Sequence, residues 1–79
     1  MNAVHAYYTL RLMAAGETLR SEGRDWYTLT HGQNTWDVPT DAAKLLIHMG
    51  MIDRAGATLD HTYWQVTPKG WEALKRGDL

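Results

Sequence analysis

Residues 38–52 constrain the fold more than any other stretch, because they predict a short helix that passes directly into a strand. Thr40 is the expected N-cap, and Pro39 before it prevents the helix from extending backwards. Gly50 is the expected left-handed residue that ends the helix. The apolar residues recur at the spacing of one helix face: Ala42, Leu45, Leu46 and Met49. This face should pack against the core.

Residues 3–15 carry a second helical pattern. Its expected inner stripe consists of Ala3, Ala6, Tyr7, Leu10, Met13 and Ala14. His5 and Thr9 should face solvent, and Gly16 should end the helix. Because this helix is apolar over more than half of its circumference, it is either central in the fold or covered by a partner.

A third helix is predicted over residues 68–76. Thr67 is its expected N-cap, and Pro68 takes the first helical position, where the missing N–H costs nothing. Trp71 and Leu74 should point into the core, together with the inner stripes of the other two helices.

The segments between the helices are rich in β-formers and alternate as strands do. Residues 26–30 and 35–38 predict a hairpin before the central helix. Residues 17–21 lead into a turn at residues 22–25, which precedes this hairpin. Residues 51–54 and 61–67 predict a second hairpin after the central helix. The expected class is α+β, with the whole chain of 79 residues forming one domain.

Two motifs in the C-terminal half resemble winged-helix proteins. Residues 45–52, LLIHMGMI, are similar to the exit of a recognition helix into the wing, and residues 64–74, WQVTPKGWEAL, to the return from the wing to the last helix. The resemblance implies a winged-helix-like order, helix–hairpin–helix–winged hairpin–helix. It also implies binding of duplex DNA, with the recognition helix in the major groove and the wing on the backbone. A conventional helix-turn-helix would place a second helix within residues 17–38, but no 3.6-residue period is evident there.

The composition favours a small binding protein of the cytoplasm. The chain has no cysteine, so neither disulfides nor a thiolate metal site can reinforce it. No apolar run approaches the roughly 18 residues of a membrane span, and the N-terminus lacks the features of a signal peptide. The net charge is −1, which gives no overall attraction to nucleic acid or membranes.

No catalytic constellation is evident in the sequence. Ser21 is the only serine, and no histidine lies at a sequence spacing that would indicate a serine nucleophile with its base. The four histidines fall in separate predicted elements, without a His-x-x-x-His pair that could hold a metal. Asp60 and His61 are adjacent, but a solvated loop explains them better than an acid–base pair. We therefore expect a protein that is not an enzyme and needs no cofactor.

The candidate binding residues are basic and aromatic side chains near the hairpins, on the central helix and on the last helix. They are Arg20, Arg24, Lys44, His48, Arg54, His61, Tyr63 and Lys69. The basic members can contact phosphates, although nearly every one has an acid beside it. The central helix carries no Arg, Asn or Gln that could read base edges.

Two functions fit these residues. The resemblance favours a DNA-binding transcriptional regulator that acts on duplex DNA. The alternative is a protein-binding inhibitor or adaptor that reaches a host protein or nucleoprotein complex through the second hairpin and exposed aromatics. Some phage-encoded inhibitors, anti-CRISPR proteins among them, are similar to the chain in being short and free of cysteine. The oligomeric state is left open, a dimer included.

Overall fold

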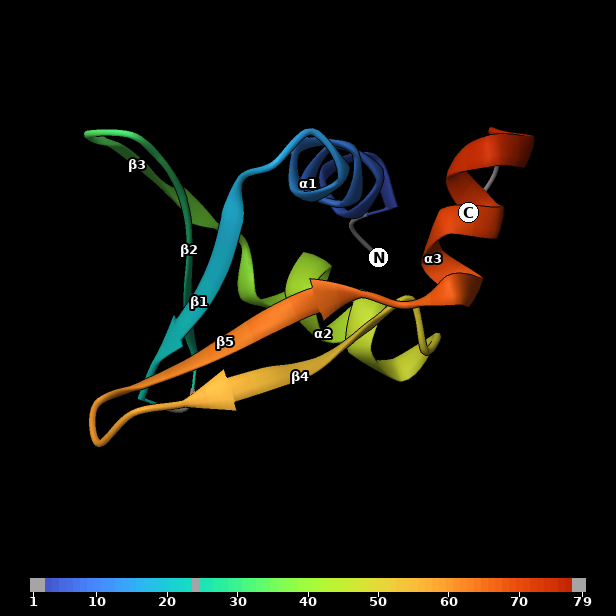
Figure 1. Cartoon of the computed structure of the whole chain (residues 1–79). Coiled ribbons are helices and arrows are strands. Elements are labelled where there is room, and N and C mark those ends of the chain that lie inside the picture. Colours follow the sequence, from blue (N-terminus) through green and yellow to red (C-terminus); the bar gives the residue numbers. More distant parts are fainter. Residues whose placement is uncertain (1–2, 24, 78–79) are drawn as a thin grey trace.

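The computed structural model describes residues 3–23 and 25–77, which form three helices and five strands (Figure 1). The helices are α1 (Ala3–Ala14), α2 (Thr40–His48) and α3 (Pro68–Arg76). The strands are β1 (Thr18–Glu22), β2 (Trp26–His31), β3 (Asn34–Val38), β4 (Ile52–Ala57) and β5 (His61–Val66). The chain order is α1–β1–β2–β3–α2–β4–β5–α3. The predicted α+β class is confirmed.

The strands form one antiparallel sheet in the order β3–β2–β1–β5–β4. Both predicted hairpins are present, as β2–β3 and β4–β5. Between them lies β1, where the sequence predicted only a lead into a turn. Leu19 of β1 is opposite Leu29 of β2 on one side and Trp64 of β5 on the other. The two hairpins are thereby joined into a single sheet.

The core lies between the helices and one face of this sheet. Its largest fully buried side chains are Leu10 of α1, Leu19 of β1 and Leu46 of α2. Each leucine removed from water contributes about 1.5–3 kcal/mol to folding. The rings of Tyr27 and Trp64 extend this core, with their centroids 6.4 Å apart. The inner stripe predicted for the central helix is confirmed at Ala42 and Leu46, and Leu45 and Met49 of the same stripe are partly buried.

Three helical residues differ in burial from the prediction, and the first of them is Ala3, which was predicted to be inside but is exposed at the start of α1. Thr9 is only 4% exposed, because its hydroxyl donates a 2.7 Å hydrogen bond to the carbonyl oxygen of His5 and thereby avoids the cost of burying a polar group. Trp71 was predicted to be inside but is 51% exposed. Helix α3 instead approaches the core through the small residues Gly70 and Ala73, which leaves the indole at the margin.

The start of α2 also differs from the prediction. Thr40 is the first helical residue, Pro39 takes the cap position, and no side chain caps the helix. The hydroxyl of Thr40 donates to the carbonyl oxygen of Asp25, and one carboxylate oxygen of Asp41 accepts from the N–H of Ala42. Thr40 therefore ties α2 to the turn between β1 and β2 rather than capping its own helix.

Thr67 joins the end of α2 to the start of α3. Its hydroxyl accepts a 3.1 Å hydrogen bond from the N–H of Gly70, which confirms the predicted cap. The same hydroxyl donates to the carbonyl oxygen of Gly50 at 2.6 Å, and the N–H of Thr67 donates to the carbonyl oxygen of Met51 at 3.0 Å. Gly50 has the predicted left-handed conformation, with φ 73°. The position of α3 is thus fixed by the residues that follow α2.

We expect Gly70→Ala to destabilise the protein. A β-carbon at this position would collide with the carbonyl oxygen of Met51 and with Cγ1 of Val66. At an exposed helical site the same change would add about 1 kcal/mol of stability, whereas overpacking here should remove about 1–3 kcal/mol. Urea denaturation measures the difference. Gly56→Ala is the control, because a β-carbon there meets no atom within 4 Å and should cause no comparable loss. A raised midpoint for Gly70→Ala would contradict the close packing of α3.

Leu46→Ala should cost about 2–5 kcal/mol, because it removes a fully buried side chain and leaves a cavity. The readout is the midpoint of thermal unfolding, followed by circular dichroism. Leu59→Ala is the matched control, since Leu59 is fully exposed in the turn between β4 and β5 and should leave the midpoint unchanged. Equal midpoints for the two variants would show that the buried face of α2 has been assigned wrongly.

Candidate binding surfaces

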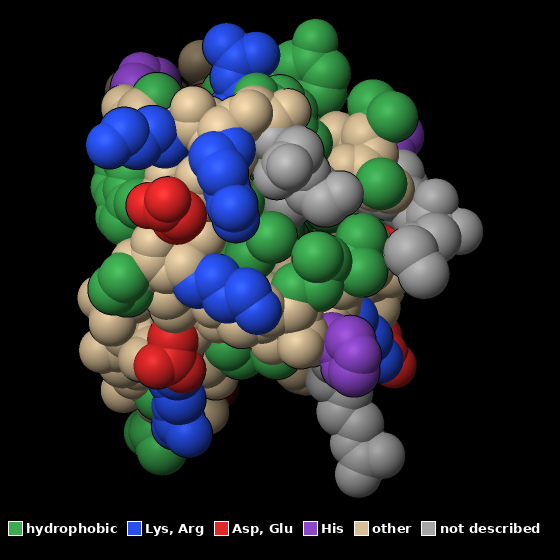
Figure 2. Space-filling view, turned by 90° about the vertical axis from the view of Figure 1, so that its right-hand side faces the viewer, with side chains coloured by type: hydrophobic (Ala, Val, Ile, Leu, Met, Phe, Trp, Pro, Cys, Tyr) green, Lys and Arg blue, Asp and Glu red, His purple; other side chains and the backbone are tan. Residues whose placement is uncertain are grey.

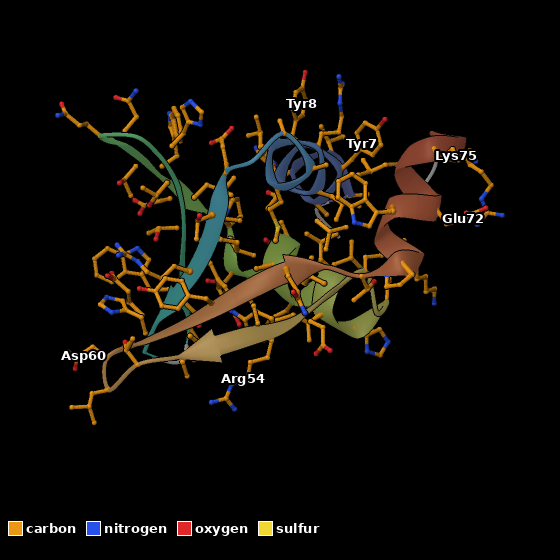
Figure 3. All side chains as sticks on the ribbon, viewed as in Figure 1. Tyr7, Tyr8, Arg54, Asp60, Glu72 and Lys75 are labelled. Atoms are coloured by element: carbon orange, nitrogen blue, oxygen red, sulfur yellow. The ribbon has the colours of Figure 1, made fainter. Side chains whose placement is uncertain are left out.

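The residues predicted to bind a partner do not form one surface. Arg20, His61 and Tyr63 come together where β1 pairs with β5. The other described members are exposed and lie apart from them: Lys44 and His48 on α2, Arg54 on β4 and Lys69 on α3. Figure 3 shows Arg54 projecting below β4. Arg24 lies outside the described residues.

The face of the sheet that points away from the helices carries the first candidate surface. Arg20 lies opposite both Tyr63 and Thr28, and Glu22 lies opposite both His61 and Trp26. Directly opposed residues of an antiparallel pair project to the same side, and alternate residues such as Leu19 project to the core. We call this face the sheet surface. It consists of Arg20, Glu22, Trp26, Asp37, His61 and Tyr63, whereas Thr28, on the same side of its strand, is only 3% exposed.

A carboxylate holds the polar side chains of the sheet surface in place. Oε1 of Glu22 lies 2.8 Å from Nε2 of His61 and 3.3 Å from Nη2 of Arg20. All three side chains are more than two-thirds buried. The ring of His61 is also 6.4 Å from that of Tyr63. Arg20, predicted as a phosphate contact, is therefore paired with an acid, and His61, predicted likewise, lies against the same carboxylate oxygen.

Trp26 is the exposed anchor of the sheet surface. Its side chain is 56% exposed, yet its Nε1–H donates a 2.9 Å hydrogen bond to Oδ1 of Asp37 on β3. The indole is thus presented to solvent in a fixed orientation. Trp26 was not among the predicted binding residues. The alternation of residue types in β2 could have indicated it, because Trp26 shares its side of the strand with the polar Thr28, while the apolar Tyr27 and Leu29 lie on the core side; Thr28 itself is buried as well.

The exposed face of α2 carries little net positive charge. Nζ of Lys44 forms an ion pair with Oδ1 of Asp25 at 2.7 Å. The hydrogen bond that Lys44 donates to this carboxylate, followed by the negative charge of the carboxylate, raises the pKa of Lys44 above its usual value. Lys44 therefore stays cationic, but its charge is balanced by an acid from the turn between β1 and β2.

The second candidate surface is a groove between α1 and α3, which no sequence pattern indicated. Its main hollow has a volume of about 690 Å³. The residues that line the main hollow are Tyr7, Arg11, Ala14, Trp71, Leu74 and Lys75. A second hollow of about 320 Å³ shares Tyr7 and is lined further by Ala3, Val4, Tyr8 and Gly77. We call these two hollows together the helix groove. Figure 2 shows hydrophobic side chains beside Lys and Arg side chains on this side of the molecule.

Two features of the helices explain the helix groove. Because α3 packs on the sheet through Gly70, the indole of Trp71 is left at the groove. Helix α1 in turn exposes a stripe at i, i+4 and i+8, which consists of Val4, Tyr8 and Leu12. Figure 3 shows Tyr7 on the side of α1 that faces α3. The guanidinium carbon of Arg11 lies 5.8 Å from the centroid of the Tyr7 ring, within reach of a cation–π contact.

The described residues offer no metal cluster and no activated nucleophile. No three His, Cys, Asp or Glu side chains among them are grouped so as to hold a metal ion. The hydroxyl of Ser21 is buried and accepts a 3.2 Å hydrogen bond from Nε1 of Trp64. Within the same residues, none of the helices has both the length and the apolar character needed to cross a lipid bilayer.

No protein-family model, curated protein or solved structure matches the chain. The resemblance to winged-helix proteins therefore stays a prediction, based on the motifs at the end of α2 and the start of α3.

We expect Asp37→Ala to release the indole of Trp26. Loss of the acceptor should shift the Trp26 indole N–H signal in a ¹H–¹⁵N NMR spectrum and speed its exchange with solvent, because the hydrogen bond no longer protects it. The indole signal of Trp71, which lies on α3, serves as the control and should stay in place. An unchanged Trp26 signal would mean that Asp37 does not hold the ring.

Proposed function

We propose that the protein is a non-catalytic module that binds another protein through the sheet surface. The supporting observation is the indole of Trp26, which is half exposed and yet held by Asp37. Around it lie Arg20, His61 and Tyr63. Trp, Tyr and Arg are the residue types that dominate binding hot spots. Aromatic side chains that are already fixed lose little conformational freedom on binding.

The charges of the sheet surface suit a protein better than a nucleic acid. Glu22 forms an ion pair with Arg20 and also lies against His61, and Asp37 lies beside Trp26. A nucleic-acid site needs an excess of cations, because the release of counterions from phosphates supplies most of the affinity. A mixed set of fixed charges around an aromatic anchor is typical of the specific part of a protein interface. In this proposal the module is an inhibitor or adaptor that acts in the cytoplasm on a host protein or nucleoprotein complex.

Duplex DNA is the second candidate, and the resemblance to winged-helix regulators supports it. In that function α2 would enter the major groove and the β4–β5 hairpin would contact the backbone. Arg54 and Lys69 are exposed near the end of α2 and could contact phosphates. However, Lys44 is paired with Asp25, and Asp41 adds a negative charge to the first turn of α2. We therefore place protein binding first.

Capture of a partner from host lysate, with the nucleic acids digested, tests the sheet surface. Trp26→Ala should weaken the binding free energy for a defined partner by about 2 kcal/mol or more, which is a fall of roughly 30-fold in affinity. Trp36→Ala is the matched control, because Trp36 is 49% exposed but lies opposite Leu29, on the side of the sheet that faces the helices. Equal loss of the partner in both variants, or in neither, would contradict the proposal.

Gel-shift measurements separate the two candidate functions. A protein-binding module should show no shift of duplex DNA at low salt. A DNA-binding module should bind, should lose affinity steeply as salt rises, and should be weakened by Arg54→Ala and Lys69→Ala. Binding with that salt dependence, together with a captured partner that disappears after nuclease treatment, would favour the winged-helix function.

A further inference from the structure

The helix groove has the chemistry of a docking site separate from the sheet surface. Trp71 is 51% exposed, although its indole is the largest apolar group on α3. Tyr7, Leu74 and Ala14 complete the apolar lining of the main hollow. An apolar groove with an aromatic wall is the kind of surface that takes up a helix from a partner.

The charges of the helix groove narrow the choice of occupant. Its main hollow has a cation on each wall, Arg11 on α1 and Lys75 on α3, and no acid among the described residues that line it. Carboxylates of an incoming segment would meet opposite charge on both sides, whereas basic segments would be repelled. The aromatic and cationic side chains would also suit single-stranded nucleic acid. The second hollow argues against this occupant, because none of the described residues that line it is charged and these residues offer successive phosphates no cation.

The two hollows of the helix groove adjoin at Tyr7, which lines both of them. A partner helix presents apolar side chains at i, i+3 or i+4, and i+7 along one face, and these can fill successive hollows past Trp71, Tyr7 and Val4.

We infer that the helix groove binds an acidic amphipathic helix of a partner protein. The apolar face of that helix packs on Tyr7, Trp71 and Leu74, and its flanking Asp or Glu side chains pair with Arg11 and Lys75. This site is independent of the sheet surface, so either proposal can fail while the other stands.

Selection from a random peptide library on the full chain tests this inference. Enriched peptides should show apolar residues at helical spacing and a clear excess of Asp and Glu. Their affinity should fall at least tenfold with Trp71→Ala and stay unchanged with Trp26→Ala, which alters only the sheet surface. Circular dichroism confirms that each variant is folded.

A charge-reversal variant tests whether the two cations of the helix groove select acidic partners, and it leaves the apolar lining residues unchanged. Arg11 and Lys75 are both exposed, so the double change Arg11→Glu and Lys75→Glu should leave the fold intact. Selection on this variant should yield basic peptides in place of acidic ones.

Several outcomes would overturn the inference: no enrichment, enrichment without an acidic excess, or equal binding by the Trp71→Ala variant. A twelve-nucleotide oligothymidine serves as the competing probe. Binding of this oligonucleotide that depends on Trp71 and exceeds the affinity of the selected peptides would assign the helix groove to single-stranded nucleic acid instead.

Discussion

Both candidate surfaces depend on the pairing of β1 with β5. This pairing joins the strands that precede α2 to the hairpin that follows it. It places Glu22 beside His61 across 39 positions of sequence, and so assembles the polar part of the sheet surface. It also holds β5, which continues through Thr67 into α3. Because β5 leads into α3, and Thr67 between them is also tied to the end of α2, the same pairing contributes to the placement of α3 beside the helix groove.

The two surfaces use aromatic residues in different ways. On the sheet surface, a hydrogen bond fixes the polar edge of Trp26, and the neighbouring charges are balanced within the protein. In the helix groove, Tyr7 and Trp71 line an apolar hollow whose cations are carried by both walls. The first arrangement favours a specific contact between two rigid surfaces. The second favours binding of a partner helix whose apolar and acidic side chains complement the groove. A module with both could hold two segments of one partner, or two partners at once.

The sequence predicted those parts of the fold that depend on local interactions. Gly50 and Thr67 mark helix ends through their own backbone conformation or hydrogen bonds, so their roles could be read from neighbouring residues. Strand β1 could not be predicted in this way. Its only large apolar residue is Leu19, and its extended conformation is fixed by pairing partners on both sides.

The candidate site was only partly predictable for the same reason. Arg20, His61 and Tyr63 were identified by residue type, but their common surface depends on the strand register. Trp71 was placed in the core because helical spacing alone does not reveal that Gly70 approaches the carbonyl of Met51. Lys44 was assigned to a free helix face, since its partner Asp25 lies in a different element, 19 positions away.

Proton–proton NOE contacts between backbone atoms of β1 and β5, measured by NMR on the isotope-labelled protein, test the central claim most directly. The structure predicts cross-strand contacts between Arg20 and Tyr63 and between Glu22 and His61, in addition to those that link β1 to β2. Contacts from β1 to β2 alone, with none to β5, would contradict the single five-stranded sheet and both surfaces that depend on it.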